Sequence, residues 1–264
     1  GGHARAMLER VAPEAVFHLA GQAFPPISWD DPWDTLENNI RSQANLLDGM
    51  VKLGISPRTM VVGSGDEYGL ARPEDLPLRE DCPLRSNSPY AVSKVAQDLL
   101  GQAYFLSHGL PVLRVRPFNH IGPRQSESFV VPAFAKQLAA IEAGQQEPVM
   151  RVGNLTARRD FTDVRDMVRA YYLILTRGEP GEVYNVGSGR SYAIGEILDS
   201  LVSFCRVPVR VEQDPARMRP VDIPDIRCDT TRLYRATGWQ AVIPLEQSLR
   251  DVLDDWRAIT RRAK

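Results

Sequence analysis

Short apolar runs alternate with longer amphipathic segments through the first half of the chain. The runs at 15–20, 59–63 and 111–115 have the length and apolar character of buried parallel strands. Between them, residues 34–53 repeat apolar positions with a helical period, and residues 89–107 form a second predicted helix. Strands that alternate with helices predict a doubly wound parallel sheet of the α/β class, whose ligands bind beyond the carboxyl ends of the strands.

The second half of the chain mixes shorter elements. We expect helices at 129–143, 163–177, 193–204 and 230–236 and from about 245, and strands at 149–152, 183–186 and 207–212. This order predicts two lobes that interleave in sequence. The cofactor lobe would contain 1–117, 155–186 and 225–234, and a smaller α/β substrate lobe would contain 118–154, 187–224 and 235–264.

A serine, a tyrosine and a lysine form the candidate chemistry. Ser88 suits a helix N-cap, which places Tyr90 and Lys94 one turn apart on one helix face. We expect the lysine ammonium to lower the pKa of the phenol, as general acid–base chemistry requires. Ser64 follows a predicted strand and would complete a site that polarises a carbonyl. Tyr-x-x-x-Lys alone is an ordinary helical pair, but these three residues and Pro117 all fall at one edge of the predicted sheet.

The composition excludes several classes of protein. The 264 residues, 43% hydrophobic and 25% charged, carry a formal net charge of -1, which argues against binding nucleic acid or a membrane surface through bulk charge. No apolar run approaches the ~20 residues of a membrane span, and the first residues lack a signal-peptide pattern. Cys82, Cys205 and Cys228 are odd in number and far apart, so we expect free thiols in a reducing cytoplasm. Neither the cysteines nor the histidines have metal-ligand spacing, and no metal site is expected.

A glycine pair in the second half imitates a dinucleotide-binding loop. Gly187-Ser188-Gly189 follows a predicted strand and precedes a helix, which is the context that such a loop requires. Tyr192 stands where the third glycine would be, and no acidic residue ends a suitable next strand. We therefore do not take it as the cofactor loop.

Four segments resemble the extended short-chain dehydrogenases/reductases that act on nucleotide sugars. They are His18-Leu19-Ala20-Gly21-Gln22, Gly63-Ser64-Gly65-Asp66-Glu67-Tyr68-Gly69, the pair Tyr90/Lys94, and Arg116-Pro117-Phe118-Asn119. The last three correspond to the S-S-x-x-V-Y-G, Y-x-x-x-K and R-x-x-N patterns of the family, and Gly65 replaces its frequent second hydroxyl. The resemblance runs over residues 4–259 and implies a Rossmann-type fold with bound NAD or NADP.

Further segments resemble the members of this family that use GDP-sugars. They are Phe118–Pro123, Val152–Leu155, Arg158–Asp166 and Arg219–Asp222. Their sequences resemble the reductases of GDP-4-keto-6-deoxy-D-mannose more than the GDP-mannose 4,6-dehydratases. The family opens with a strand and a G-x-x-G-x-x-G turn that the printed sequence lacks. The printed sequence therefore corresponds to the family pattern from ~60 residues, or two βα units, onward. We interpret it either as a fragment or as a sequence printed without its leading segment.

The resemblance implies a role for each matching residue. Tyr90 would protonate the developing alkoxide at C4, Ser64 would hydrogen-bond that oxygen, and Lys94 would hold the nicotinamide ribose. The other residues implied in cofactor binding are Leu19, Ala20, Gln22 and Pro117. Those implied in substrate binding, besides Ser64, are Gly65, Asn119, Arg159, Arg219 and Asp222, the arginines because a guanidinium grips phosphate oxygens. The product would be GDP-D-rhamnose or its C4 epimer. The resemblance leaves open whether the cofactor is NAD or NADP.

Two alternatives and an assembly state remain as hypotheses. A 4,6-dehydratase needs a carboxylate two residues after Ser64, where Asp66 stands. The alternative from another class is a non-catalytic nucleotide-binding protein, against which intact Ser64, Tyr90 and Lys94 argue, or an inactive fragment, which the missing glycine-rich turn favours. The helices at 34–53 and 89–107 carry apolar residues on more than one face, and the family pairs them across a two-fold axis, so we expect a homodimer.

Overall fold

The chain folds into two compact units that interleave in sequence. The computed structural model describes residues 2–217 and 223–262. The first unit contains the residues up to Phe118 together with Val168–Val186 and Cys228–Gln240, and the second contains Asn119–Met167, Gly187–Arg227 and the residues from Ala241 on. Whether these units correspond to a cofactor lobe and a substrate lobe with the predicted boundaries stays a proposal.

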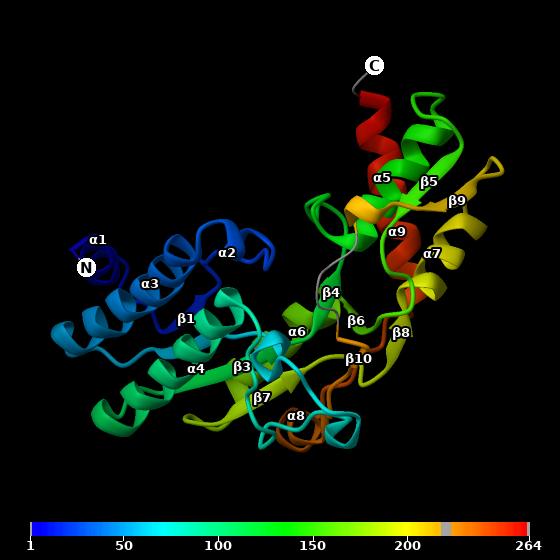
Figure 1. The fold of residues 1–264 in the computed structure, drawn as a ribbon. Coiled ribbons are helices and arrows are strands. Elements are labelled where there is room, and N and C mark those ends of the chain that lie inside the picture. The colour runs from blue at the N-terminus through cyan, green and yellow to red at the C-terminus, as the bar shows by residue number, and fades with distance from the viewer. Residues whose placement is uncertain (1, 218–222, 263–264) are drawn as a thin grey trace. The chain divides into compact units, whose positions relative to one another are not determined.

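A parallel sheet organises the first unit (Figure 1). Its strands are, in spatial order, β1 (Ala15–His18), β2 (Arg58–Val62), β3 (Val112–Pro117) and β7 (Val183–Val186). Its helices are α1 (Gly2–Val11), α2 (Ile27–Asp30), α3 (Pro32–Leu53), α4 (Pro89–His108), most of α6 (Val164–Arg177) and α8 (Thr231–Thr237), with 3-10 turns η1 (Gly65–Tyr68) and η2 (Pro73–Asp75). The carboxyl ends of the neighbouring strands align in the register His18–Val61, Val62–Val115 and Pro117–Val186.

Local signals fix the ends of α3 and α4, the two helices that pack against each other beside this sheet (Figure 1). Asp31 accepts a hydrogen bond from the backbone N–H of Asp34 at the start of α3, and Gly54 ends that helix in the left-handed conformation, at φ 65°. Ser88 caps α4 by accepting from the N–H of Ala91. The caps therefore set where Tyr90 and Lys94 stand on the first two turns of α4.

The second unit is built from two small sheets and three helices. One sheet has parallel strands in the order β10 (Asp225–Ile226), β6 (Arg158–Asp163) and β4 (Asn119–Ile121), with β8 (Ser191–Ala193) antiparallel to β6. The other pairs β5 (Val149–Val152) with β9 (Arg210–Gln213). The helices are α5 (Val130–Glu142), α7 (Ile194–Ser203) and α9 (Leu245–Arg262), and a 3-10 turn η3 (Pro215–Arg217) follows β9.

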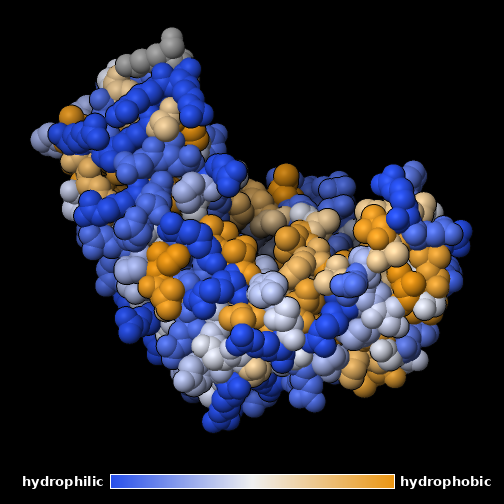
Figure 2. All heavy atoms as spheres, turned by 180° about the vertical axis from the view of Figure 1, so that it is seen from behind, coloured by the Kyte–Doolittle hydropathy of each residue, from blue (hydrophilic) through white to orange (hydrophobic). Residues whose placement is uncertain are grey.

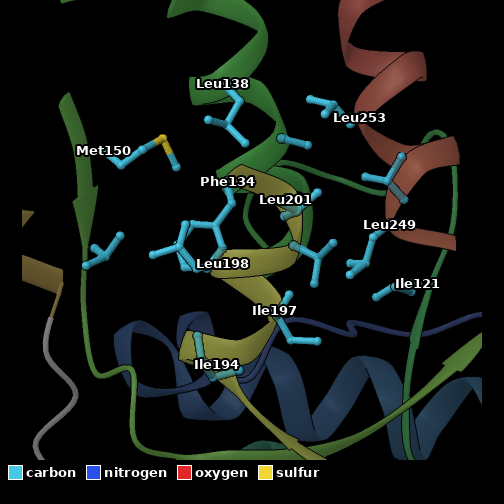
Figure 3. Packing of buried hydrophobic residues seen from close by; sticks show 14 of the residues in the cluster. Ile121, Phe134, Leu138, Met150, Ile194, Ile197, Leu198, Leu201, Leu249 and Leu253 are labelled. Carbon is cyan, nitrogen blue, oxygen red and sulfur yellow. The ribbon is translucent and has the colours of Figure 1, made fainter. Parts of the chain in front are cut away.

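Figure 3 shows the hydrophobic core of the second unit. Phe134 and Leu138 of α5, Ile197, Leu198 and Leu201 of α7, and Leu249 and Leu253 of α9 point toward one another, with Met150 of β5 and Ile121 of β4 beside them. Burial of such side chains contributes about 1.5–3 kcal/mol each. This unit therefore has its own core and does not depend on the parallel sheet for one.

The α/β class with parallel sheets and interleaved helices is confirmed, with one omission in the sequence interpretation. The strand predicted for 207–212 begins later, at Arg210. The sheet of β4, β6, β8 and β10 was not predicted, because these strands are short and rich in polar residues. All three cysteines are free thiols. Within the described residues, no helix has the length and apolar character to cross a membrane.

Candidate active site

Ser64 stands at the carboxyl end of β2, where the chain turns into η1. Its backbone N–H donates to Oε1 of Glu67 at 2.8 Å, and its Oγ accepts from the N–H of Asp66 at 3.1 Å. These two bonds form a capping box around the start of η1. Ser64 is 8% exposed. Its hydroxyl is thus held in one place at the sheet edge, as the sequence predicted.

Tyr90 and Lys94 approach this serine from α4. Lys94 Nζ donates to the backbone oxygen of Val62 at 3.1 Å and lies 5.9 Å from the centre of the Tyr90 ring. Val62 is the last residue of β2, two before Ser64. The Ser64 side chain is close enough to the Tyr90 hydroxyl to act on its pKa. The structure therefore brings Ser64, Tyr90 and Lys94 together within one unit.

The pKa of Tyr90 differs from the sequence expectation. Burial raises the pKa of the phenol above its usual value, and the nearby Asp66 carboxylate raises it further, while the hydrogen bond with Ser64 acts in the opposite direction. The expected lowering by Lys94 is wrong for this arrangement, because desolvation of the phenolate outweighs a lysine whose Nζ lies 5.9 Å from the ring centre. Tyr90 is therefore a protonated phenol over the whole neutral range, which is the form that donates a proton.

Lys94 is also shifted by burial. Desolvation lowers its pKa to about 8. His18, at the end of β1, has its pKa lowered to about 4 by burial and then by Lys94, so it is a neutral imidazole. Its Nε2 is buried and has no hydrogen-bond partner within the described part of the chain. An uncharged ring beside Lys94 adds no second positive charge to the site.

Asn39 of α3 fixes the turn that follows β1. Its side chain accepts from the N–H of Gln22 at 2.7 Å, donates to the Gln22 carbonyl at 3.1 Å and donates to Ser93 Oγ at 2.9 Å. A Cβ on Gly21 would lie 2.9 Å from Asn39 Oδ1 and 3.9 Å from Lys94 Nζ, so a glycine is needed there. The sequence interpretation missed Asn39. Its helical spacing from the apolar Leu36 marks it as a polar residue on the buried face of α3, which would have identified it.

The other predicted cofactor residues lie along the same strand ends. Leu19 and Ala20 are exposed just beyond β1, and Gln22 is half-buried in the turn held by Asn39. Pro117 ends β3 and pairs with Val186. These positions, a lysine donor and the unsatisfied His18 nitrogen suit the nicotinamide end of NAD(P), so the residues that are present fit that half of the cofactor.

The residues predicted to bind substrate divide between the units. Gly65 is buried beside Ser64, where a Cβ would make a tight contact, 3.1 Å from Cγ of the Phe118 ring. Asn119 is exposed at the start of β4 in the second unit. Arg159 of β6 is half-buried and donates to the carbonyl of Ile223 at 2.7 Å. Arg219 and Asp222 lie outside the described residues.

The glycine pair of the second unit has a structural role. The carboxylate of Asp160 accepts from the N–H groups of Ser188 and Gly189 at 2.8 and 2.9 Å, and from Ser188 Oγ at 2.6 Å. A phosphate-binding loop needs such N–H groups to face its ligand. Here a buried carboxylate of the same chain occupies them, in agreement with the missing third glycine.

Comparison with known proteins gives the same picture. A family model described as GDP-mannose 4,6 dehydratase matches residues 2–252. GDP-6-deoxy-D-mannose reductase of Pseudomonas aeruginosa is 41% identical over 249 residues, which cover 94% of this chain and 82% of the relative. GDP-mannose 4,6 dehydratase 1 of Arabidopsis thaliana is 28% identical over 268 residues, which cover 98% of this chain and 72% of the relative.

Two solved structures share the fold closely. RMD from Pseudomonas aeruginosa, complexed with NADPH, has a TM-score of 0.90 and 40% identity, covering 94% of this chain and 82% of that one. UDP-glucose 4-epimerase from Thermus thermophilus, in complex with NAD, has a TM-score of 0.86 and 26% identity, covering 97% and 81%. The chain belongs to the GDP-mannose 4,6 dehydratase family of extended short-chain dehydrogenases/reductases.

Proposed function

We propose that the protein is an NADPH-dependent reductase of the C4 keto group of GDP-4-keto-6-deoxy-D-mannose, giving GDP-D-rhamnose or its C4 epimer. The observation that carries this proposal is the convergence of Ser64, Tyr90 and Lys94 in a chain that is 41% identical to a GDP-6-deoxy-D-mannose reductase. The neighbour complexed with NADPH supports NADP rather than NAD as the cofactor.

The protonation states of the three residues suit reduction rather than oxidation. The nicotinamide supplies a hydride when it is bound. Tyr90, kept protonated by burial, donates its proton to the C4 oxygen as charge develops there. The hydroxyl of Ser64, held by the capping box, hydrogen-bonds the same oxygen. Lys94 orients the ribose and, with its pKa lowered to about 8, can replace the lost proton.

For the GDP end of the substrate, the family resemblance implies four residues. Arg159 and Arg219 suit the diphosphate, Asp222 suits a ribose diol, and Asn119 suits a phosphate or sugar hydroxyl. Arg159 is half-buried and donates to the carbonyl of Ile223. The four assignments rest on the family resemblance.

A GDP-mannose 4,6-dehydratase is the second candidate. Asp66 follows Ser64 by two residues, where this reaction needs a base, and its charge acts on Tyr90. The matching family model also carries the dehydratase name. A carboxylate that raises the pKa of the tyrosine opposes the phenolate that an initial oxidation requires, so we favour the reductase. An inactive binding protein is the remaining alternative.

Removal of the Tyr90 hydroxyl tests the proposed reaction. In a protein that carries the glycine-rich opening segment, Tyr90→Phe should lower kcat for NADPH-dependent reduction by ~10²-fold or more, because the proton donor is lost while the ring remains. Calorimetric binding of GDP should be unchanged, and a residual kcat close to that of the parent protein would refute the role of Tyr90.

The same assay separates the two enzymes. GDP-mannose supplied without external reductant should not be converted. Conversion to a 4-keto product, and its loss in Asp66→Asn, would show that the protein is the dehydratase. If neither substrate reacts, the binding-protein alternative replaces both.

The pH at which Lys94 loses its proton is a second test. The chain has only four lysines, so the side-chain signals of labelled lysine can be assigned by NMR with Lys94→Arg. We expect a midpoint at about pH 8. Because this pKa is depressed in the folded state, the stability linked to Lys94 is present above the unfolded pKa of 10.5 and is lost as the pH falls through about 8. A midpoint near 10.5 would contradict the buried placement.

We also infer a homodimer, with the contact on α4. On α3, the helix predicted at 34–53, Leu46 and Leu47 are buried in the core of the first unit and are not available for a dimer contact. Val92, Leu99 and Leu106 recur at intervals of seven on α4 and are 48%, 52% and 71% exposed, which makes one apolar stripe. Other apolar groups also reach the surface, as Figure 2 shows. The three free thiols support a cytoplasmic location.

A charge placed in the α4 stripe tests the dimer. Leu99→Glu should convert a dimer into a monomer in sedimentation equilibrium, since an interface of ~1,200 Å² or more would have to bury the new carboxylate. Val242→Glu, at a position that is 69% exposed in the second unit, is the matched control and should leave the dimer intact. A monomeric parent protein at micromolar concentration would rule out the proposal.

A further inference from the structure

A fully buried glutamate lies directly beneath the catalytic serine. Glu67 is inaccessible to solvent, and its Oε1 accepts the backbone N–H of Ser64 at 2.8 Å. The preceding residue, Gly63, makes room for it, because a Cβ there would lie 2.0 Å from Oε1. The loop between β2 and η1 is thus built around this carboxyl group.

Arg116 and Asp98 are the charged neighbours of the other oxygen. Asp98 of α4 accepts from Arg116 Nε and Nη2 at 2.8 and 2.5 Å, and from Arg114 Nη1 at 2.6 Å. Arg116 Nη1 donates instead to the hydroxyl of Tyr68 at 3.0 Å and to a backbone carbonyl at 3.1 Å. The donors of Arg116 are thus largely committed to Asp98 and Tyr68.

Oε2 of Glu67 is left without a donor. It lies 3.0 Å from Arg116 Nε, but that N–H points at Asp98, and within residues 2–217 and 223–262 no group donates a hydrogen bond to Oε2. A buried carboxylate oxygen that accepts nothing is strongly disfavoured. A carboxylic acid whose Oε2–H donates to Asp98 satisfies both side chains, and the two carboxyl groups are close enough to shift each other's pKa.

The charges around Glu67 act in the same direction. Burial and the adjacent Asp98 raise the pKa of Glu67 well above its usual value, against the opposing pull of Arg116. Asp98 takes the arginines as partners and has a lowered pKa. The titratable and charged groups that interact with Glu67 are Tyr90, Lys94 and Asp98 on α4 and Arg116 on β3.

We infer that Glu67 is a positioning residue for Ser64 and is a neutral carboxylic acid, with one proton shared between Glu67 and Asp98. Its Oε1 fixes the backbone of the serine, and its Oε2–H anchors the loop to α4, the helix that carries Tyr90 and Lys94. Because the group is uncharged, it places no negative charge under the oxygen that accumulates charge during reduction. This part of the inference rests on the proposed function.

Paired substitutions separate the hydrogen bond from the charge. Glu67→Gln keeps an acceptor for the Ser64 N–H and a donor for Asp98, so kcat for the keto sugar should stay within ~3-fold and its pH profile should not move. Glu67→Met removes both polar atoms at similar length, and kcat should fall ~10-fold or more with KM within ~3-fold, since the serine loses its anchor in the transition state. Glu74→Gln, an exposed carboxyl in η2, is the matched control.

The proton itself has readouts that need no substrate. At neutral pH the parent protein should show the infrared carbonyl band of a protonated carboxyl group, which Glu67→Gln lacks and Glu74→Gln keeps. A carboxyl group whose pKa is raised on folding stabilises the protein fully below the unfolded pKa of 4.5 and loses this contribution as the pH rises. The melting temperature of Glu67→Gln should therefore rise relative to the parent protein between about pH 5 and about pH 8.

Each outcome decides one part of the inference. Absence of the infrared band, or a pH profile displaced in Glu67→Gln, would show that Glu67 is ionised. If Glu67→Met has the kcat of the parent protein, Glu67 does not position Ser64. If Glu67→Met does not fold, a ~10-fold loss of kcat in Glu67→Gln would contradict the positioning role instead. If the parent protein reduces no GDP-4-keto sugar, the proposed function fails, whereas the infrared and melting measurements still decide the state of Glu67.

Discussion

The ion cluster of Asp98, Arg114 and Arg116 is the interaction on which the first unit depends. It ties α4 to β3 through three arginine hydrogen bonds of 2.5–2.8 Å, all of them buried. Desolvation of these charges is costly, and removal of one partner from such a cluster destabilises a protein by about 3–5 kcal/mol. The cluster thus adds little net stability, but it fixes how α4 lies on the sheet. Because Tyr90 and Lys94 stand on the first two turns of that helix, their position relative to β2 follows from it.

Desolvation then sets the direction of the chemistry. The same burial that makes the cluster rigid raises the pKa of Tyr90 and lowers those of Lys94 and His18. In each case burial favours the uncharged form of the side chain, as expected when a group moves from water into a medium of low polarity. The site at neutral pH therefore contains a protonated phenol, a lysine near its midpoint and a neutral imidazole. Such a set is ready to give a proton to a substrate oxygen, which is what reduction of a ketone requires.

The sequence predicted the parts of the structure that depend on local pattern. Apolar runs marked the four strands of the parallel sheet, Ser88 marked the start of α4, and helical spacing placed Tyr90 beside Lys94. Features that depend on long-range burial were missed. Strand β6 has a polar sequence, and its carboxylates bind partners that are far away along the chain, so no local pattern marks it as a strand. The pKa of Tyr90 depends on its burial more than on the nearby lysine. Glu67 looked like an ordinary loop residue because its partners, Asp98 and Arg116, come from other elements.

The segment from Arg158 to Asp166 shows that a family-specific motif need not be a catalytic one. Asp160 holds the Ser188–Gly189 turn, and Asp163 accepts from Ser248 of α9 and from Arg165. Asp166 accepts the N–H groups of two successive residues before α9, at 2.8 Å each. Backbone N–H groups in irregular loops have no partner from a helix or a sheet, and these carboxylates supply the hydrogen-bond acceptors instead. The acidic residues of this segment hold the loops of the second unit, whereas the residues that we propose for the chemistry are Ser64, directly before η1, and Tyr90 and Lys94 on α4.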